Sequence, residues 1–187
     1  MRRSFGKLFL LLLLSLSAQT VLAQKVSVST NLLGWTALGT MNIEGGYSLA
    51  QHYSLIAGVR YNPWTFQLGG IETRNQQLSA AIGVRYWPWY VYSGWWMSGQ
   101  VQYLQFSNTG IWRPALHEGR GTGAALSAGY TRMIHEHFNV EFGLGFWAGY
   151  LWDHTLYASP TSHFVRRDGA GMVFYPNYLS ISLMYVF

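Results

Sequence analysis

The stretch Leu179–Phe187, LSISLMYVF, alternates apolar with mostly small side chains and ends on an aromatic residue. Successive side chains of an extended strand point to opposite faces, so every second residue of this stretch shares one side. The residues on its apolar side are Leu179, Ile181, Leu183, Tyr185 and Phe187. Chain ends usually fray in water. We therefore expect a β-strand with one apolar face that something outside the strand holds in place.

The beginning of the chain suggests where that strand resides. Residues 1–7, MRRSFGK, are basic, and the apolar run LFLLLLLSLSA that follows is too short to span a bilayer comfortably. This pattern is typical of a secretory signal peptide. Val21-Leu22-Ala23 supplies the cleavage positions, so we predict a signal peptide over 1–23 and a mature domain over 24–187. The chain has no cysteine, which excludes disulfides as a source of stability.

The composition argues against both nucleic-acid binding and an ordinary soluble domain. Three of the 12 Lys and Arg residues lie in the predicted signal, which leaves nine bases against seven acids. A net charge of about +2 gives no support for nucleic-acid binding. The chain is 17% aromatic and only 10% charged, whereas roughly a quarter of the residues of a soluble domain are charged.

Alternation of polarity recurs along the whole mature chain. No later segment has the ~20 consecutive apolar residues of a membrane helix, which leaves a closed barrel as the way to satisfy backbone groups in lipid. The alternating segments are residues 25–32, 41–49, 53–62, 78–87, 96–104, 122–131, 139–150 and 179–187. We therefore predict an all-β, eight-stranded antiparallel up-and-down transmembrane β-barrel in the bacterial outer membrane. Both termini are expected in the periplasm, and longer external loops around 63–76, 105–120 and 152–174.

Aromatic residues gather at the ends of these segments, which predicts two interfacial girdles. The predicted girdle residues are Trp35, Trp64, Trp87, Trp89, Tyr90, Tyr92, Trp95, Trp112, Trp152 and Tyr175. The alternative is a soluble β-sandwich or lipocalin-like barrel with the apolar face turned inward. Its water-facing side would then consist of Gly, Ser and Ala with few charges, a composition of poor solubility.

Four motifs add a family resemblance: STNLLGW (29–35), YNPWTF (61–66), RYWPW (85–89) and the closing LSISLMYVF. Together they resemble the small outer-membrane barrels of Bacteroidetes grouped as domain of unknown function 3575. The resemblance implies an outer-membrane protein, in some cases encoded near fimbrial components, without an established activity. It also implies that Leu179, Ile181, Leu183, Tyr185 and Phe187 form the signal read by the barrel-assembly machinery.

Four charged residues occupy inward positions by alternation: Glu44, Arg60, Arg85 and Glu141. We expect Glu44 to lie diagonally beside Arg60 in a hairpin, and Arg85 to meet Glu141 across a narrow interior. Two interpretations remain open. The charges, with Gln100 and Gln102, form a structural plug without a continuous water channel, or they form a polar relay or gate. A narrow pore is a further alternative.

Candidates for chemistry are few. Asp153-His154 and Ser162-His163 are neighbours in sequence without a nucleophile elbow. His135-Glu136-His137 lacks the third ligand and the helix of a zinc motif. We therefore expect no catalysis, cofactor or metal, and the alternative is a lipid-A-modifying enzyme.

Arginines in the predicted external loops form the last candidate site. Arg113, Arg120, Arg166 and Arg167 could bind lipopolysaccharide phosphates, or they are solvated loop charges. The sequence as a whole favours a structural or envelope-interaction role. The expected partners are outer-membrane lipid and lipopolysaccharide, the barrel-assembly machinery, and fimbrial or other envelope proteins.

Overall fold

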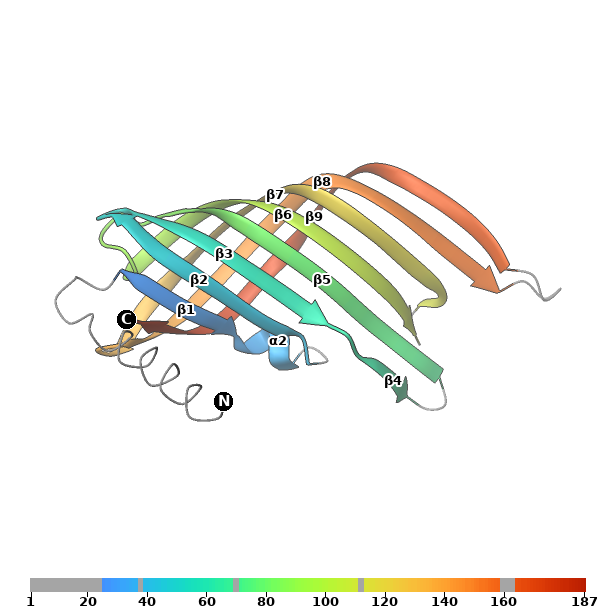
Figure 1. Ribbon diagram of the computed structural model, residues 1–187, viewed down its shortest axis with the longest axis horizontal. Coiled ribbons are helices and arrows are strands. Elements are labelled where there is room, and N and C mark those ends of the chain that lie inside the picture. Colours follow the sequence, from blue (N-terminus) through green and yellow to red (C-terminus); the bar gives the residue numbers. More distant parts are fainter. Residues whose placement is uncertain (1–24, 37–38, 69–70, 111–112, 159–163) are drawn as a thin grey trace, which may run out of the picture.

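The computed structural model describes residues 25–36, 39–68, 71–110, 113–158 and 164–187. The predicted signal peptide and Trp112 lie outside these residues. The described chain folds into a single antiparallel sheet and one short helix, α2 (Leu32–Thr36) (Figure 1). The strands are β1 (Val26–Asn31), β2 (Met41–Ala50), β3 (Tyr53–Asn62), β4 (Thr65–Leu68), β5 (Ile71–Tyr86), β6 (Gly94–Gly110), β7 (Arg113–His135), β8 (Phe138–Ala158) and β9 (Phe164–Val186). None of the helices in the described ranges has the length and hydropathy to cross a bilayer.

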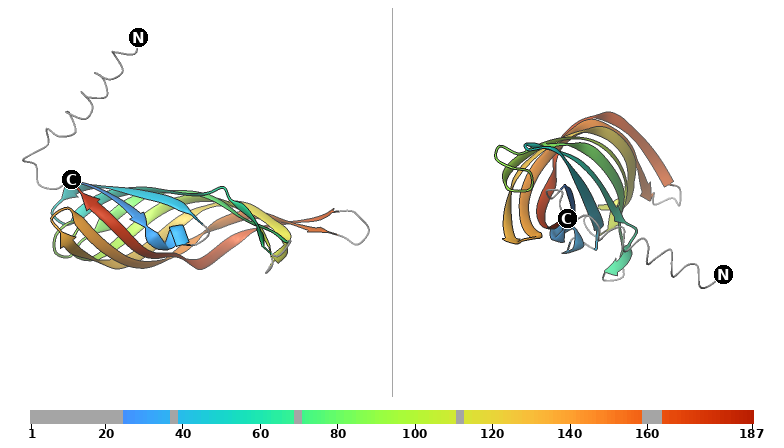
Figure 2. Two further views of the ribbon diagram at one scale, coloured as in Figure 1. Left: turned by 90° about the horizontal axis from the view of Figure 1, so that it is seen from below. Right: turned by 60° about the vertical axis from the view of Figure 1, so that its left-hand side comes forward.

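The sheet closes on itself (Figure 2). Strands that follow one another along the chain pair, except that β3 pairs with β5 and not with β4, and β1 pairs with β9 to complete the circle. This closed ring consists of β1, β2, β3, β5, β6, β7, β8 and β9. The all-β, antiparallel, up-and-down order was therefore predictable from the alternating segments.

The described part of the chain has nine strands, which corrects the predicted number of eight. The additional strand, β4, pairs only with β5 and stands outside the ring. Residues 63–64 separate it from β3, and Pro63 in this gap has no N–H to donate to a ladder. β3 and β4 therefore pair one after the other with the same strand, β5.

Strand register explains why the ring can close. Followed around the sheet from Val28, the paired residues run through Gly45, Ala57, Ile82, Val101, Ala124 and Ala148 to Phe174. Val28 itself pairs with Tyr185, which lies 11 residues beyond Phe174. A stagger of this kind tilts the strands against the axis of the closed sheet and leaves an interior just wide enough for side chains.

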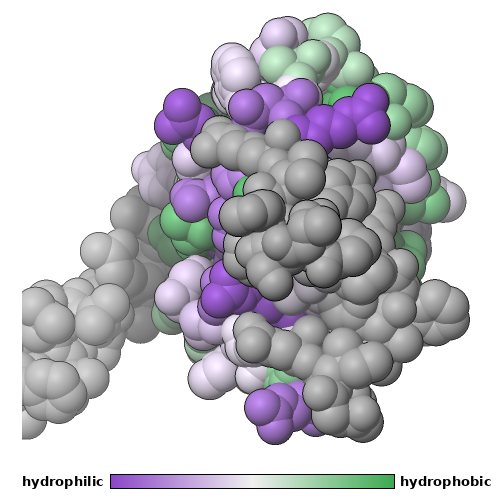
Figure 3. Space-filling model, turned by 90° about the vertical axis from the view of Figure 1, so that its right-hand side faces the viewer, coloured by the Kyte–Doolittle hydropathy of each residue, from purple (hydrophilic) through white to green (hydrophobic). Residues whose placement is uncertain are grey.

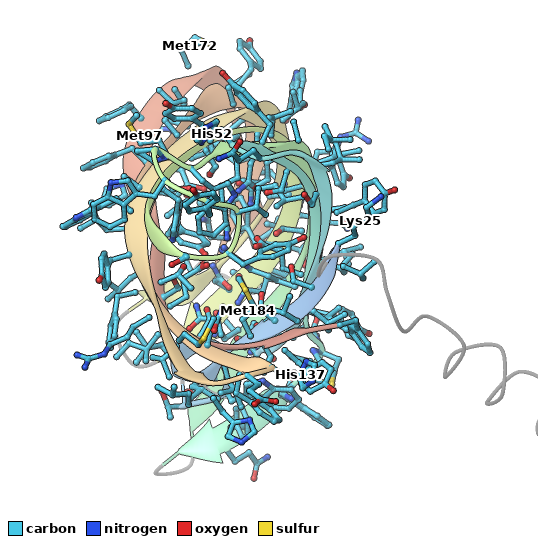
Figure 4. The ribbon with its side chains drawn as sticks, turned by 90° about the vertical axis from the view of Figure 1, so that its left-hand side faces the viewer. Lys25, His52, Met97, His137, Met172 and Met184 are labelled. Carbon is cyan, nitrogen blue, oxygen red and sulfur yellow. The ribbon has the colours of Figure 1, made fainter. Side chains whose placement is uncertain are left out.

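The two faces of the ring differ in polarity as the alternation predicts. The inner face buries mostly polar residues, among them Ser54, Ser127 and Glu141, whereas large apolar residues stand on the outer face. Val101 and Leu126 there are 63% and 70% exposed. In a view from the end that carries both Lys25 and Phe187, Met184 lies inside the ring, and Met97 and Met172 point away from it (Figure 4).

The strands extend much further than predicted at the opposite end of the ring, here called the mouth. Residues around 63–76, 105–120 and 152–174 were expected to form external loops, but most of the described ones belong to β4–β9. β8 and β9 form a long hairpin that reaches beyond the other strands (Figure 2). Alternation could not reveal these segments, because both faces of a sheet that projects beyond the ring tolerate polar residues.

The seam between β1 and β9 is short. Five residue pairs, from Ser27–Val186 to Asn31–Ser182, join the two strands. The Asn31 side chain then bonds the β9 backbone, where its Nδ2 donates to the Leu179 carbonyl at 2.9 Å and its Oδ1 accepts from the Ile181 N–H at 3.2 Å. Among the described residues, β9 has no strand partner on this side before Ser182, so its upper part forms an open edge.

Candidate functional site

A layer of charge crosses the ring near the end that carries both termini. Arg85 on β5 donates to Glu141 on β8 and to Glu44 on β2, each at 2.8 Å. The side chains of Arg85 and Glu141 are both 1% exposed, whereas that of Glu44 is 21% exposed. Thr131 also donates to Glu141 at 3.2 Å. One buried guanidinium thus bridges carboxylates from opposite walls, and we call these three residues the charge layer.

The structure brings three of the four predicted luminal charges together and leaves the fourth apart. Glu44 was expected beside Arg60, and the register does place Asn42 opposite Arg60. The Glu44 carboxylate nevertheless pairs with Arg85. Arg60 donates instead to the Asn177 carbonyl at 3.3 Å and lies 5.2 Å from the centre of the Tyr178 ring.

Aromatic rings seal the ring directly beside the charge layer. The seal cluster, defined as Trp87, Tyr92, Trp96, Met184 and Val186, forms one buried apolar group. The Arg85 guanidinium lies 4.1 Å from the centre of the Trp96 ring, close enough for a cation–π contact. A Cβ at Gly129 or Gly143 would collide with that ring, so these two glycines make room for it.

The seal cluster overturns part of the predicted girdle. Trp87 and Tyr92 were expected at the membrane interface, but Trp87 is 0% and Tyr92 4% exposed inside the ring. Both belong to the connection between β5 and β6, which folds inward. Tyr92 has a φ of 68° there, and its carbonyl accepts from Asn139 at 2.9 Å while its hydroxyl donates to the Lys25 carbonyl at 3.0 Å. Burial raises the pKa of the Tyr92 phenol, which therefore remains a donor at neutral pH.

A second, polar layer lies on the mouth side of the charge layer. It surrounds a cavity of about 40 Å³ whose lining includes Glu44, Arg60, Gln100 and Gln102. Asn177 donates to the Gln102 side chain at 2.9 Å, and Gln102 donates to Ser79 at 3.2 Å. A cavity of this size and polarity holds only a few water molecules.

A β-bulge in β9 directs residues into this layer. Gly145 pairs with Tyr178 and the next residue, Phe146, pairs with Pro176, so Asn177 is the extra residue. Even-numbered residues such as Ser180 face inward on the C-terminal side of the bulge, and odd-numbered residues such as Tyr175 face inward on its N-terminal side. The bulge thus exchanges the inner and outer faces of β9. Sequence alternation alone gave no sign of this reversal.

Apolar side chains fill the interior between the polar layer and the mouth. Trp147, 0% exposed, packs with Leu104 and Ala125, and Phe106, Leu151, Val173 and Tyr175 surround them. Glycines 123 and 149 lie against the Trp147 ring. Tyr175, predicted for a girdle, thus packs inside the ring, while Trp35, Trp64, Trp89, Tyr90, Trp95 and Trp152 are exposed.

A cavity of about 910 Å³ opens at the mouth. Three consecutive residues from each of β5–β9 line it, together with Tyr61–Pro63. These residues are 76–78, 105–107, 118–120, 152–154 and 168–170. Asp153 is one of the lining residues, and its Oδ2 lies 2.9 Å from Nε2 of His117. Polar side chains are visible around the rim when this end faces the viewer (Figure 3). We treat the charge layer and this mouth cavity as the two candidate sites.

The residues considered for catalysis do not form a triad. Asp153 pairs with His117 on the inner face, whereas His154 pairs with Glu118 on the outer face at 3.2 Å. Ser107 donates to Glu118 at 2.8 Å, so the serine contacts the acid and not a histidine. Ser162 and His163 lie outside the described residues. Sequence reasoning missed Arg74, Ser107 and Glu118, because they were assigned to loops.

The remaining predicted sites stay apart or without ligands. Arg120 and Arg167 are exposed and lie on opposite faces by alternation, and the side chains of Arg113 and Arg166 lie outside the described part. His137 bonds the Val186 carbonyl at 2.9 Å. In the described ranges, no group of three or more His, Cys, Asp or Glu residues could hold a metal ion.

The residues of the predicted assembly signal lie along the last strand. Leu179, Ile181, Leu183 and Phe187 are exposed on the outer face. Tyr185 is half-buried within an aromatic group, in which its ring centre lies 5.0 Å from that of Phe138 and 4.8 Å from that of Phe187. This part of the strand presents a continuous apolar surface.

Comparison with known proteins gives one match. A family model described as "Protein of unknown function (DUF3575)" matches residues 8–187. No curated protein and no solved structure matches the chain.

Proposed function

Because the chain belongs to the DUF3575 family, whose description names no activity, we propose a function from the geometry alone. The protein is a β-barrel of the bacterial outer membrane whose closed interior excludes a water channel. Its role is structural or interactive: it contributes to the membrane itself, or contacts another envelope component.

The observation that carries this proposal is an uncharged band on the outer face. The outward residues of β3 from Tyr53 to Tyr61, of β5 from Leu78 to Tyr86 and of β6 from Trp95 to Tyr103 include no charged side chain. Each of these bands is nine residues long, close to the roughly 9–11 tilted residues that cross a bilayer. Each of the three segments begins or ends on an aromatic residue, as interfacial girdles do.

Polar residues border the band toward the mouth. On the outer face, Arg74, Ser107, Glu118 and His154 form a hydrogen-bonded row across β5–β8. Charged groups on a lipid-facing wall are costly at the midplane and tolerated near the interfaces. The row therefore fits the outer boundary of the hydrocarbon layer, with the mouth outside the cell and both ends of the described chain in the periplasm.

Three successive layers support a closed interior. The seal cluster, the charge layer and the apolar group around Trp147 each span the ring, and the cavity between them measures about 40 Å³. A continuous water channel would need polar walls along its whole length. The expected partners are lipid, lipopolysaccharide, the assembly machinery that reads the last strand, and an envelope protein.

The test is expression in a Gram-negative host followed by membrane fractionation. We expect the protein in the outer-membrane fraction, with a gel mobility that differs between boiled and unboiled samples. Single-channel recording of the purified protein in planar bilayers should give no steady current. Recovery as a freely dissolved periplasmic protein would refute the membrane assignment, and a large ohmic current would refute the closed interior.

A further inference from the structure

The uncharged band on the outer face is taller on β8 than on β3, β5 and β6. The outward residues of β8 from Phe138 to Trp152 include no charged side chain, and this segment spans 15 residues. The bands on β3, β5 and β6 span nine residues each. The upper part of the apolar wall on β8 therefore has no counterpart on those three strands.

The stagger of the ring explains the difference. The polar border of the band follows paired residues, from Ser107 through Glu118 and His154 to Asp168 on β9. Paired residues do not keep one height, because the row of pairs that starts at Val28 reaches β9 11 residues nearer the mouth than the residue of β9 that pairs with Val28. The polar border thus climbs toward the mouth from β6 to β9, and the apolar surface beneath it grows taller.

Large apolar side chains occupy the additional height. The β8–β9 patch, defined as Phe146, Tyr150, Trp152, Met172 and Phe174, is exposed, and Met172 and Phe174 are 74% and 70% accessible. The rings of Phe146 and Phe174 stack with 5.4 Å between their centres, and those of Tyr150 and Trp152 lie 4.8 Å apart. Met172 points away from the ring (Figure 4). An exposed apolar surface of this kind marks contact with a membrane or with another molecule.

The surroundings of the patch favour lipid as that neighbour. Toward the end that carries both termini, the patch continues without a polar border into Leu144 and Leu179, which are 59% and 70% exposed on the uncharged band. Toward the mouth it ends on Trp152, two residues before His154, as an aromatic residue at a membrane interface would. A protein-docking surface typically has a polar rim around its apolar core, and the side that merges with the band has no such rim.

We propose that the acyl chains of the outer leaflet cover the β8–β9 patch, so that the hydrocarbon layer reaches nearer the mouth on this wall than on β3, β5 and β6. A membrane accommodates a taller apolar wall by tilt of the protein or by local thickening of the bilayer. The inference rests on the proposed membrane location, and it assigns to lipid a surface that a level boundary would leave in water.

The test measures the depth of nitroxide labels on single cysteines, since the chain has no cysteine of its own. The full-length protein is folded into vesicles of dioleoylphosphatidylcholine. The labels are then exposed to oxygen, which concentrates in hydrocarbon, and to a nickel chelate, which stays in water. Boiled and unboiled gel mobilities report that each variant is folded.

Met172→Cys is the test variant, and Gln105→Cys is the matched control. Both residues are exposed on the outer face. Met172 shares a row of pairs with Tyr103, two residues before Gln105, and the climb from β6 to β9 adds about four residues. Met172 therefore stands nearer the mouth than Gln105, so a level boundary would leave Met172 the wetter of the two.

We expect the label at Met172 to collide mainly with oxygen and the label at Gln105 mainly with nickel. Equal access at the two positions, or the opposite order, would overturn the proposal. Protection of the Met172 label from both reagents would also overturn it, because a second copy of the chain would then cover the patch. Phe174→Cys repeats the measurement on the same patch in case Met172→Cys does not fold.

A label at Leu126, in the middle of the band on β7, distinguishes failure of this inference from failure of the membrane location. Oxygen access in Leu126→Cys together with nickel access in Met172→Cys would refute only the lipid contact of the β8–β9 patch. Nickel access in Leu126→Cys would refute the membrane location itself.

Discussion

Arg85 is the residue on which the closed interior depends most. It contacts Glu44, Glu141 and the Trp96 ring, and its side chain is only 1% exposed. Its Nε has no hydrogen-bond partner among the described residues. A buried ion pair is weak evidence for stability by itself, but the removal of one partner leaves an uncompensated charge.

Glu141→Ala should lower the free energy of unfolding by about 3–5 kcal/mol, because Arg85 keeps only the more exposed Glu44 as a carboxylate partner. Urea unfolding of the protein in lipid vesicles, followed by tryptophan fluorescence, measures the change. Glu44→Gln is the control and should cost less, because that side chain is partly exposed. Equal stability of Glu141→Ala and the unmodified protein would mean that the charge layer is not a structural unit.

The inward positions of the four luminal charges and the pairing of Arg85 with Glu141 could be predicted from the sequence, but the partners of Glu44 and Arg60 could not. The pairing of Glu44 depends on which side chain reaches across the ring, and this depends on the stagger between distant strands. Trp87 and Tyr92 were misplaced for a related reason. Their connection folds inward, and an aromatic residue at a strand end looks the same in sequence whether it faces lipid or closes the interior.

At the scale of the strand, the outer face of β8 gives the sharpest test of the membrane assignment. Leu144 is exposed on that face near the middle of the uncharged band. Leu144→Arg should cost about 2–4 kcal/mol in a bilayer, since the charge would lie at the midplane. Gln105→Arg, an outward position at the mouth side of the band, is the control and should cost about 0–1 kcal/mol. Vesicle unfolding curves that show the same cost at both positions would contradict the placement of the band.

The short seam between β1 and β9 leads to a separate prediction. Asn31→Ala removes the two side-chain bonds to the β9 backbone beyond the last paired residues. We expect a loss of about 1–3 kcal/mol from the unpaired β9 groups, and faster hydrogen exchange of the amides of Ser29 and Leu183. The amides of Leu126 and Leu144, which lie in long strand pairs, serve as the reference. Unchanged exchange at the seam would show that the five residue pairs hold it without the Asn31 side chain.

Element boundaries were less predictable than the strands themselves. The eight alternating segments correspond to strands because one face is apolar and the other polar. The extensions of β6–β9 beyond the ring lack that contrast, and so they looked like loops. The bulge at Asn177 was equally hidden, because it turns Asn177 and Tyr178 inward without changing the local composition.

For the molecule as a whole, the proposed closure of the interior rests on layers in series. Replacing Trp87 and Tyr92 together by alanine removes the lower seal and leaves the charge layer and the group around Trp147 in place. We expect a lower unfolding temperature without a steady current in planar bilayers. A continuous current from this double variant would mean that the seal cluster alone separates the two compartments.

The open edge of β9 bears on how copies of the protein behave when they are crowded. A long strand with free backbone groups is a template for another chain. Here the edge carries Arg167 and Asp168, two glycines and Pro176, and charges and proline at an edge discourage such pairing. Neighbouring molecules that diffuse in one plane would therefore remain separate and would not assemble into a continuous fibre through this strand.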